Sequence, residues 1–185
     1  MPGKLVWLGL LLSKQLKSRH GGMGAGMASS RHTAETSIEV DVPVSTAYNQ
    51  WTQFEEFPRF MENVHEVRQL DDTHLHWRAD VAGKLKEWDS EITEQIPDRR
   101  IAWRSTSGTH NAGVVTFHRL SDNRTRIMLQ MEYEPETRAE AVGGALGGVK
   151  MTARKNLQRF KELIESRGSE TGAWRGTVEG GVVQH

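Results

Sequence analysis

Residues 146–164 read LGGVKMTARKNLQRFKELI, and this stretch decides the fold. Its apolar residues recur at the three- and four-residue spacing that places side chains on one face of an α-helix. We expect this helix to begin near Thr137, just after Pro135, because proline is tolerated at a helix start but not inside one. A stripe this long needs a broad apolar surface to cover it. The stripe consists of Leu146, Val149, Ala153, Leu157, Phe160, Leu163 and Ile164.

Upstream of this helix, short segments alternate apolar and polar residues at the two-residue spacing typical of half-buried strands. Turn signals such as Pro97-Asp98 separate them at intervals of about ten residues, which indicates antiparallel hairpins. Two short helices are expected after the first strand, the second interrupted by Pro58. The class is therefore α+β: a curved antiparallel sheet of about seven strands with one long helix across it. The predicted strands cover residues 36–42, 64–70, 74–81, 85–96, 101–105, 113–117 and 126–133.

The chain has 185 residues, which is enough for one domain with a real core, and we place that domain at residues 32–168. Residues 169–185 show no apolar period and predict a loosely ordered tail. Residues 1–31 contain an apolar run at Leu5–Leu12, too short to cross about 30 Å of hydrocarbon, which takes about 20 residues. Three interpretations of this segment are open: a flexible, dispensable start, a membrane-surface helix within residues 1–20, or a signal peptide. The basic residues after the apolar run disfavour the signal peptide, because they lie between the run and any cleavage site.

Composition excludes several classes of function. The 24 basic and 24 acidic residues balance to a formal charge of zero, so no basic field invites nucleic acid as a partner. The absence of cysteine excludes disulfides, thiolate zinc sites and cysteine nucleophiles. It also fits a reducing compartment, so we expect a cytoplasmic protein, with residues 1–20 as the one candidate for membrane association.

Several local patterns, taken in order, resemble a known superfamily. An alternating strand ends at Pro43, Trp88 precedes Ile96-Pro97, and further matches are WTQF at 51–54, FPRFM at 57–61, RIAW at 100–103, GVVTF at 113–117, RFK at 159–161 and ETGAWRG at 170–176. Together they resemble the START-like superfamily, specifically its polyketide cyclase/dehydrase and coenzyme Q-binding branch, over residues 33–176. The resemblance implies a helix-grip fold, in which a seven-stranded sheet wraps the C-terminal helix around a hydrophobic cavity.

The candidate site is this cavity between sheet and helix. Large apolar side chains on the inner strand faces are expected to line it, with Ser105 as a polar group and the glycine-rich start of the helix as a gate. The alternatives are an ordinary packed core and glycines that simply allow close packing. The predicted lining comprises Trp51, Phe60, Trp77, Trp88, Trp103, Ser105, Phe117, Leu129, Met131, Tyr133, Gly143, Leu146, Gly147 and Lys150.

Catalytic and metal signals are weak. His74 and His76 have metal-ligand spacing, but they fall on the strand face opposite Leu75 and Trp77, which we expect to be solvated. Three carboxylates of residues 85–96 share the outer face, where Arg78 and Arg104 can pair with them. No nucleophile–base pair and no nucleotide fingerprint is present, so we predict no catalytic residue, no metal and no cofactor. The carboxylates are Glu87, Asp89 and Glu91.

Three functions follow from these observations. The first is binding or transport of a hydrophobic small molecule, which is a lipid, a prenyl quinone or a polyketide-like compound. The second is a polyketide cyclase or dehydratase that would use Ser105, Tyr133 or a histidine at the cavity rim. The third is a membrane-surface accessory protein held by its first residues. The sequence leans away from an enzyme and leaves the oligomeric state open.

Overall fold

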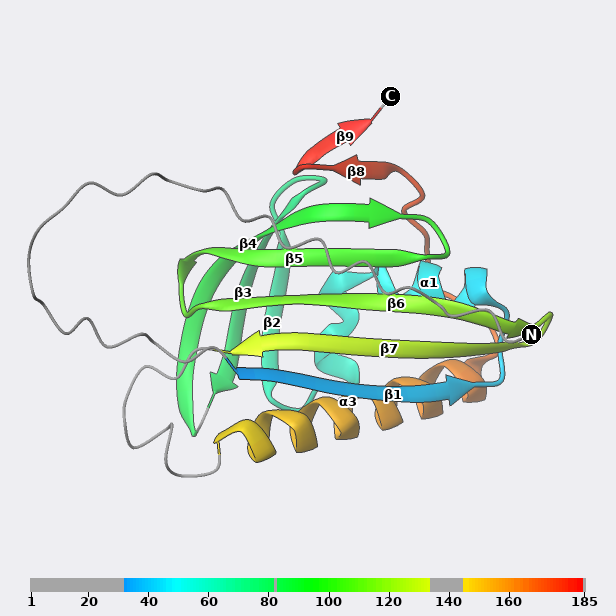
Figure 1. Ribbon diagram of the computed structural model, residues 1–185, viewed down its shortest axis with the longest axis horizontal. Helices are drawn as coiled ribbons and strands as arrows, with labels where there is room; N and C mark the ends of the chain where they lie inside the picture. Colours follow the sequence, from blue (N-terminus) through cyan, green and yellow to red (C-terminus); the bar gives the residue numbers. More distant parts are fainter. Residues whose placement is uncertain (1–31, 82, 134–144, 185) are drawn as a thin grey trace, which may run out of the picture.

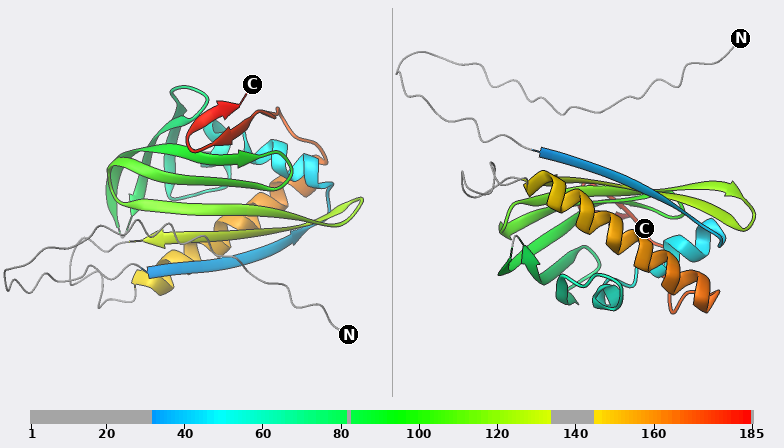
Figure 2. Two further views of the ribbon diagram at one scale, coloured as in Figure 1. Left: turned by 45° about the horizontal axis from the view of Figure 1, so that its top comes forward. Right: turned by 90° about the horizontal axis from the view of Figure 1, so that it is seen from below.

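The computed structural model of the protein describes residues 32–81, 83–133 and 145–184. Seven strands form one antiparallel sheet in the order β1-β7-β6-β5-β4-β3-β2. The long helix α3 (Ala145–Arg167) runs across one face of this sheet (Figures 1 and 2). The strands are β1 (His32–Val40), β2 (Val64–Gln69), β3 (His74–Val81), β4 (Lys84–Ile96), β5 (Arg100–Gly108), β6 (Asn111–Ser121) and β7 (Arg124–Tyr133).

Two short helices follow β1, as the sequence predicts. They are α1 (Val44–Trp51) and the 3₁₀-helix η1 (Phe54–Arg59), which contains Pro58. The α+β class and the helix-grip arrangement are therefore confirmed.

The stripe on α3 packs against the sheet as expected. Ala153, Leu157, Phe160 and Ile164 are each at most 4% exposed. Their spacing keeps them on one face of the helix, and burying four apolar side chains is the main reason that α3 holds its place. The predicted start near Thr137 lies outside the described residues.

The prediction of a loosely ordered tail is wrong for residues 177–184. They form a hairpin of β8 (Thr177–Glu179) and β9 (Val182–Gln184), and β8 pairs with β4. Gly180 and Gly181 both have positive φ, the conformation that a two-residue hairpin turn requires. Val178 is fully buried, which anchors the hairpin and raises the strand count to nine.

Gln50 in α1 and Asp98 in the turn between β4 and β5 hold the segment between α3 and β8. The buried Gln50 accepts hydrogen bonds at its Oε1 from Arg167 Nη1 at 3.1 Å and from Thr171 N at 3.0 Å. Arg175 donates to both carboxylate oxygens of Asp98, at 3.0 and 2.7 Å. Buried polar groups are stable only when paired, and here the pairing fixes the path of the chain after α3.

Aromatic rings fill the region where α1 and η1 meet the second half of α3. Phe160 packs edge-on against Trp51, with ring centroids 5.0 Å apart, and against Phe60 at 5.2 Å. Phe117 lies between Tyr48 at 5.6 Å and Trp51 at 6.2 Å. We call this region, defined by these five rings, the closed end of the interface between sheet and helix.

The predictions for residues 1–31 fall outside the described ranges. None of the helices within those ranges combines the length and apolarity that a membrane span requires.

Candidate ligand cavity

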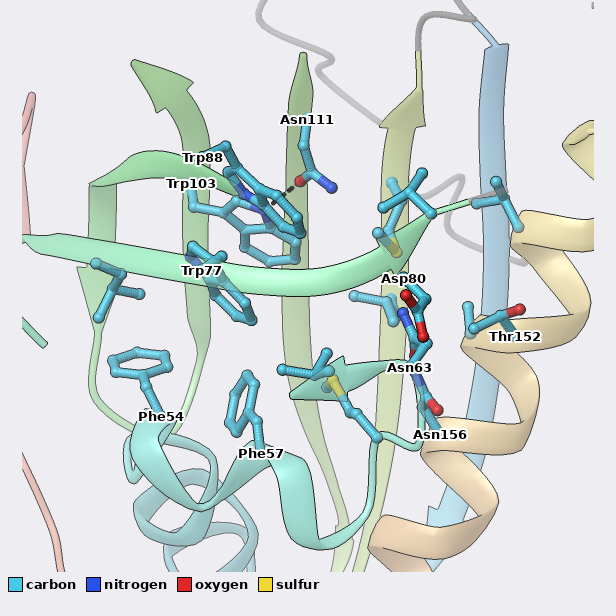
Figure 3. Close-up of a pocket in the computed structure, with 18 of the residues that line it drawn as sticks. Phe54, Phe57, Asn63, Trp77, Asp80, Trp88, Trp103, Asn111, Thr152 and Asn156 are labelled. Carbon is cyan, nitrogen blue, oxygen red and sulfur yellow. Dashed lines mark hydrogen bonds between the residues drawn. The ribbon is translucent and has the colours of Figure 1, made fainter. Parts of the chain in front are cut away.

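A cavity of about 430 Å³ lies between the sheet and the first half of α3 (Figure 3). Its walls come from α1, η1, the inner faces of β2–β7 and one face of α3. It has the size and the mainly apolar lining typical of small-molecule sites. The lining comprises Trp51, Phe54, Phe57, Met61, Asn63, Val64, Leu75, Trp77, Asp80, Val81, Gly83, Trp88, Ile92, Ile101, Trp103, Asn111, Leu129, Met131, Gly148, Val149, Met151, Thr152, Ala153 and Asn156.

Three tryptophans from neighbouring strands form one wall. Trp77 and Trp88 are directly opposite each other on β3 and β4, and their rings stack with centroids 5.9 Å apart and an angle of 1° between the planes. Trp77 Nε1 donates to Ser90 Oγ at 2.8 Å. Trp103 Nε1 donates to Asn111 Oδ1 at 2.9 Å (Figure 3). Because two of the three indole N–H groups are satisfied by the protein, the wall offers mainly apolar surface to the cavity.

A glycine sets the position of Trp103. Gly113 is its partner across β5 and β6, and a Cβ atom built on Gly113 would lie 2.5 Å from the Trp103 ring and 2.7 Å from the Gln130 carbonyl oxygen. The indole therefore occupies the place of a side chain at position 113. Gly113, the first residue of GVVTF at 113–117, thus shapes the cavity because it has no side chain that would displace the Trp103 ring.

Small side chains on α3 leave the space open. Gly148, Thr152 and Ala153 face the tryptophan wall from the helix. Cβ atoms added to Gly147 or Gly148 would meet nothing within 4 Å, so close packing against the sheet does not explain these two glycines. A gating role for the glycine-rich start stays a prediction.

The structure brings together six of the predicted lining residues and separates others. Phe60 and Phe117 belong to the closed end instead, and Ser105 Oγ accepts a hydrogen bond from Asn111 N at 3.0 Å without lining the cavity. Gly147 and Lys150 are exposed on α3 and do not line it. Gly143 and the side chains of Tyr133 and Leu146 lie outside the described part of the chain. The six residues are Trp51, Trp77, Trp88, Trp103, Leu129 and Met131.

Polar residues that the sequence analysis assigned elsewhere, or did not single out, also line the cavity. Asn156 Nδ2 donates to Asn63 Oδ1 at 3.1 Å, which joins α3 to the turn before β2. Asp80 follows the buried Ala79 on β3; its side chain is 48% exposed, and its Oδ2 lies 2.8 Å from His65 Nε2. Asp80 nevertheless borders the cavity, together with its neighbour Val81, near the end of the hairpin.

The outer face of the sheet carries the predicted charge pairs. Arg78 pairs with Glu87 at 3.6 Å and Arg104 with Glu91 at 3.0 Å. His74 and His76 bind different carboxylates, those of Asp71 and Asp89, at 2.9 and 2.7 Å. The hydrogen bond from His76, followed by that from Ser107, lowers the pKa of Asp89. The described ranges hold no group of three or more histidine and acidic side chains that could bind a metal ion.

Comparison with known proteins agrees with this architecture. Residues 40–162 match the family described as polyketide cyclase / dehydrase and lipid transport. A protein of Streptomyces lincolnensis, known as an uncharacterised 17.2 kDa protein, is 57% identical over 145 residues, which are 78% of this chain and 97% of that one.

Solved structures share the fold at low identity. A START superfamily protein from Mycobacterium smegmatis has a TM-score of 0.60 at 16% identity, covering 74% of this chain and 96% of that one. The Zhui aromatase/cyclase from a Streptomyces species has a TM-score of 0.58 at 15% identity, covering 75% and 93%. A protein from Thermus thermophilus has a TM-score of 0.64 at 17% identity, covering 75% and 100%. With the family match over residues 40–162 and a helix-grip fold around an apolar cavity, the chain belongs to the polyketide cyclase/dehydrase and lipid transport family.

Proposed function

We propose that this protein binds or carries a hydrophobic small molecule of the lipid, prenyl quinone or polyketide-like class, in the cavity between the sheet and α3. The observation that carries the proposal is the tryptophan wall, whose three rings line the cavity of about 430 Å³. An apolar ligand that buries about 300 Å² gains about 7.5 kcal/mol at 25 cal/mol per Å². Part of this gain offsets the entropy lost on association, so we expect affinities in the micromolar range or weaker for purely apolar ligands.

Two neighbouring glycines of α3 provide the test. Gly148 lines the cavity and Gly147 does not, yet each has open space where a side chain would begin. Leucine raises helix propensity equally at both positions, so any difference in binding reports the cavity alone. We expect Gly148→Leu to weaken binding by about tenfold or more by filling the cavity mouth, and Gly147→Leu to leave it unchanged.

The measurement is quenching of tryptophan fluorescence during titration with a panel of lipids, quinones and polycyclic aromatics. Native mass spectrometry of the purified protein would identify a ligand that co-purifies. If no member of the panel binds the wild-type protein, or if the two leucine variants lose affinity equally, the proposal is wrong.

A second candidate, cyclisation or dehydration of a bound polyketide-like molecule, has less support. Ser105, one of the residues that this chemistry would use, contacts the Asn111 backbone and does not line the cavity. Fold likeness to an aromatase/cyclase does not supply the missing groups.

A further inference from the structure

The cavity has an aromatic end and a polar end. The three tryptophans lie together on one side with Asn111, which accepts the Trp103 hydrogen bond, whereas Asn63, Asp80, Thr152 and Asn156 gather on the other side beside α3 (Figure 3). These four side chains come from separate parts of the chain: the turn before β2, the end of β3 and two turns of α3. Four of the five polar side chains that line the cavity thus lie at one end, and this uneven distribution favours a ligand with two unlike ends.

The polar end retains hydrogen-bonding capacity after its internal contacts are made. His65 Nε2 bonds to Asp80 Oδ2, and within the described ranges Asp80 Oδ1 has no hydrogen bond. The amides of Asn63 and Asn156 bond to each other once, at 3.1 Å. In either orientation of the two amides, this bond leaves one NH₂ group and one carbonyl oxygen for a further partner. The Asp80 side chain is 48% exposed, so its free oxygen is accessible.

We infer that the polar end binds a hydroxyl group of the hydrophobic ligand, and this inference rests on the function proposed above. Asp80 Oδ1 accepts a hydrogen bond from the ligand hydroxyl, and an amide NH₂ of Asn63 or Asn156 donates a hydrogen bond to the hydroxyl oxygen. A hydroxyl is the small group that gives and takes one hydrogen bond at the same atom, which is what a carboxylate beside an amide offers. The ligand class is therefore an apolar ring system or chain with an alcohol or phenol at one end.

Other polar groups fit less well. A carboxylate or phosphate would meet the negative charge of Asp80 without a described cation among the lining residues to offset it. A ketone or ether would accept from the amides but would leave the Asp80 oxygen without a donor. A hydrogen bond to a charged acceptor is also about twice as strong as one between neutral groups, so Asp80 dominates the preference.

The test compares two probes of nearly equal shape, 2-naphthol and 2-methylnaphthalene, by calorimetric titration of the full-length protein. The readout is the ratio of the two dissociation constants, because that ratio cancels the apolar contribution that both probes share. We expect Asp80→Ala to shift the ratio by about tenfold or more against 2-naphthol, since a site built for a hydroxyl discriminates through its polar partner. A titration with 1-octanol and n-nonane, which are also matched in length, distinguishes an alcohol from a phenol as the preferred source of the hydroxyl.

Asp89→Ala is the matched control. Asp89 pairs with a histidine, His76, as Asp80 pairs with His65, but Asp89 lies on the outer face of the sheet. An unchanged ratio in Asp80→Ala, or an equal shift in Asp89→Ala, would overturn the hydroxyl site while leaving the cavity proposal intact. Failure of 2-methylnaphthalene and of n-nonane to bind the wild-type protein would instead overturn the cavity proposal, and the hydroxyl site with it. Asp80 is exposed at the rim, and the melting temperature of Asp80→Ala confirms that the variant is folded.

Discussion

The closed end and the cavity lie along one helix and one sheet, and both are rich in aromatic residues, yet one is solid and the other is hollow. At the closed end α3 contributes Leu157, Phe160 and Ile164, which are at most 1% exposed. At the cavity it contributes Gly148, Val149, Met151, Thr152, Ala153 and Asn156, three of which are small. The rings also differ in origin: at the closed end only Phe117 comes from the sheet, whereas all three rings of the tryptophan wall do. The fully buried side chains in the second half of α3 therefore help to fill the closed end. Aromatic content alone therefore does not distinguish a core from a binding site.

A second layer strengthens the contrast. At the closed end α1 contributes two of the rings, and Gln50 ties α1 to the chain after α3, whereas Phe54 and Phe57 of η1 line the cavity. Close-packed interiors lose stability when atoms are removed, whereas side chains that border empty space have fewer contacts to lose. Stability should therefore depend on the closed end, and ligand affinity on the cavity.

The largest effect is expected from Phe160→Ala at the closed end. This side chain is fully buried against Trp51 and Phe60, so its loss leaves a void and should lower the free energy of unfolding by about 3–5 kcal/mol. Met131→Ala, which removes a partly buried side chain that already borders the cavity, should cost less than about 2 kcal/mol. Urea unfolding of both variants measures this difference. Equal losses would break the distinction between the two regions.

A smaller loss is expected from Gly113→Ala beneath the tryptophan wall. The new methyl group would overlap the Trp103 ring and the Gln130 carbonyl oxygen, and overpacking of this kind costs about 1–3 kcal/mol. The indole would have to move into the cavity, so affinity for apolar ligands should fall as well. Denaturation and ligand titration measure the two effects, and a variant with wild-type values in both would show that Gly113 does not set the position of Trp103.

A pH-dependent effect separates the two regions further. Burial raises the pKa of the Tyr48 phenol at the closed end from 10.0 to about 12, against an opposing hydrogen bond from Gln95. Between pH 10 and 12 the unfolded chain therefore loses the phenol proton before the folded chain does, so this stabilisation is complete below pH 10 and is lost as pH rises through 12. We expect Tyr48→Phe to show a shallower decline of stability over this range. Thermal unfolding at several alkaline pH values measures the decline, and parallel curves for both proteins would count against this assignment.

Much of this arrangement could be predicted from the sequence. The stripe from Ala153 to Ile164 predicts the face by which α3 packs, because helical spacing is strict and the residues are large. Alternation on β3 and β4 places Trp77 and Trp88 inside and Glu87 and Glu91 outside, where the predicted pairs with Arg78 and Arg104 form. These predictions need only local periodicity.

Periodicity shows which residues face inward, but it does not show whether an inward-facing residue lies at the cavity or at the closed end. Phe60 and Phe117 are inward-facing, as predicted, but they lie at the closed end rather than at the cavity. Asp80 is exposed, as alternation along β3 implies, but alternation does not show that its side chain also borders the cavity. The tail hairpin was missed because its strands have three residues each, too few to show a period, although Gly180-Gly181 is a hairpin turn signal.

The most direct test of a hollow cavity beside a solid core compares the same enlargement at two buried alanines. Ala47, in α1, is 0% exposed at the closed end, and Ala153, in α3, is 4% exposed and lines the cavity. We predict that Ala47→Leu lowers the free energy of unfolding by about 1–3 kcal/mol through overpacking, whereas Ala153→Leu fills empty space and costs less than about 1 kcal/mol. Ligand affinity should fall only in Ala153→Leu. Equal destabilisation by the two leucines, measured by urea unfolding, would show that the space beneath the first half of α3 is packed and would contradict the account.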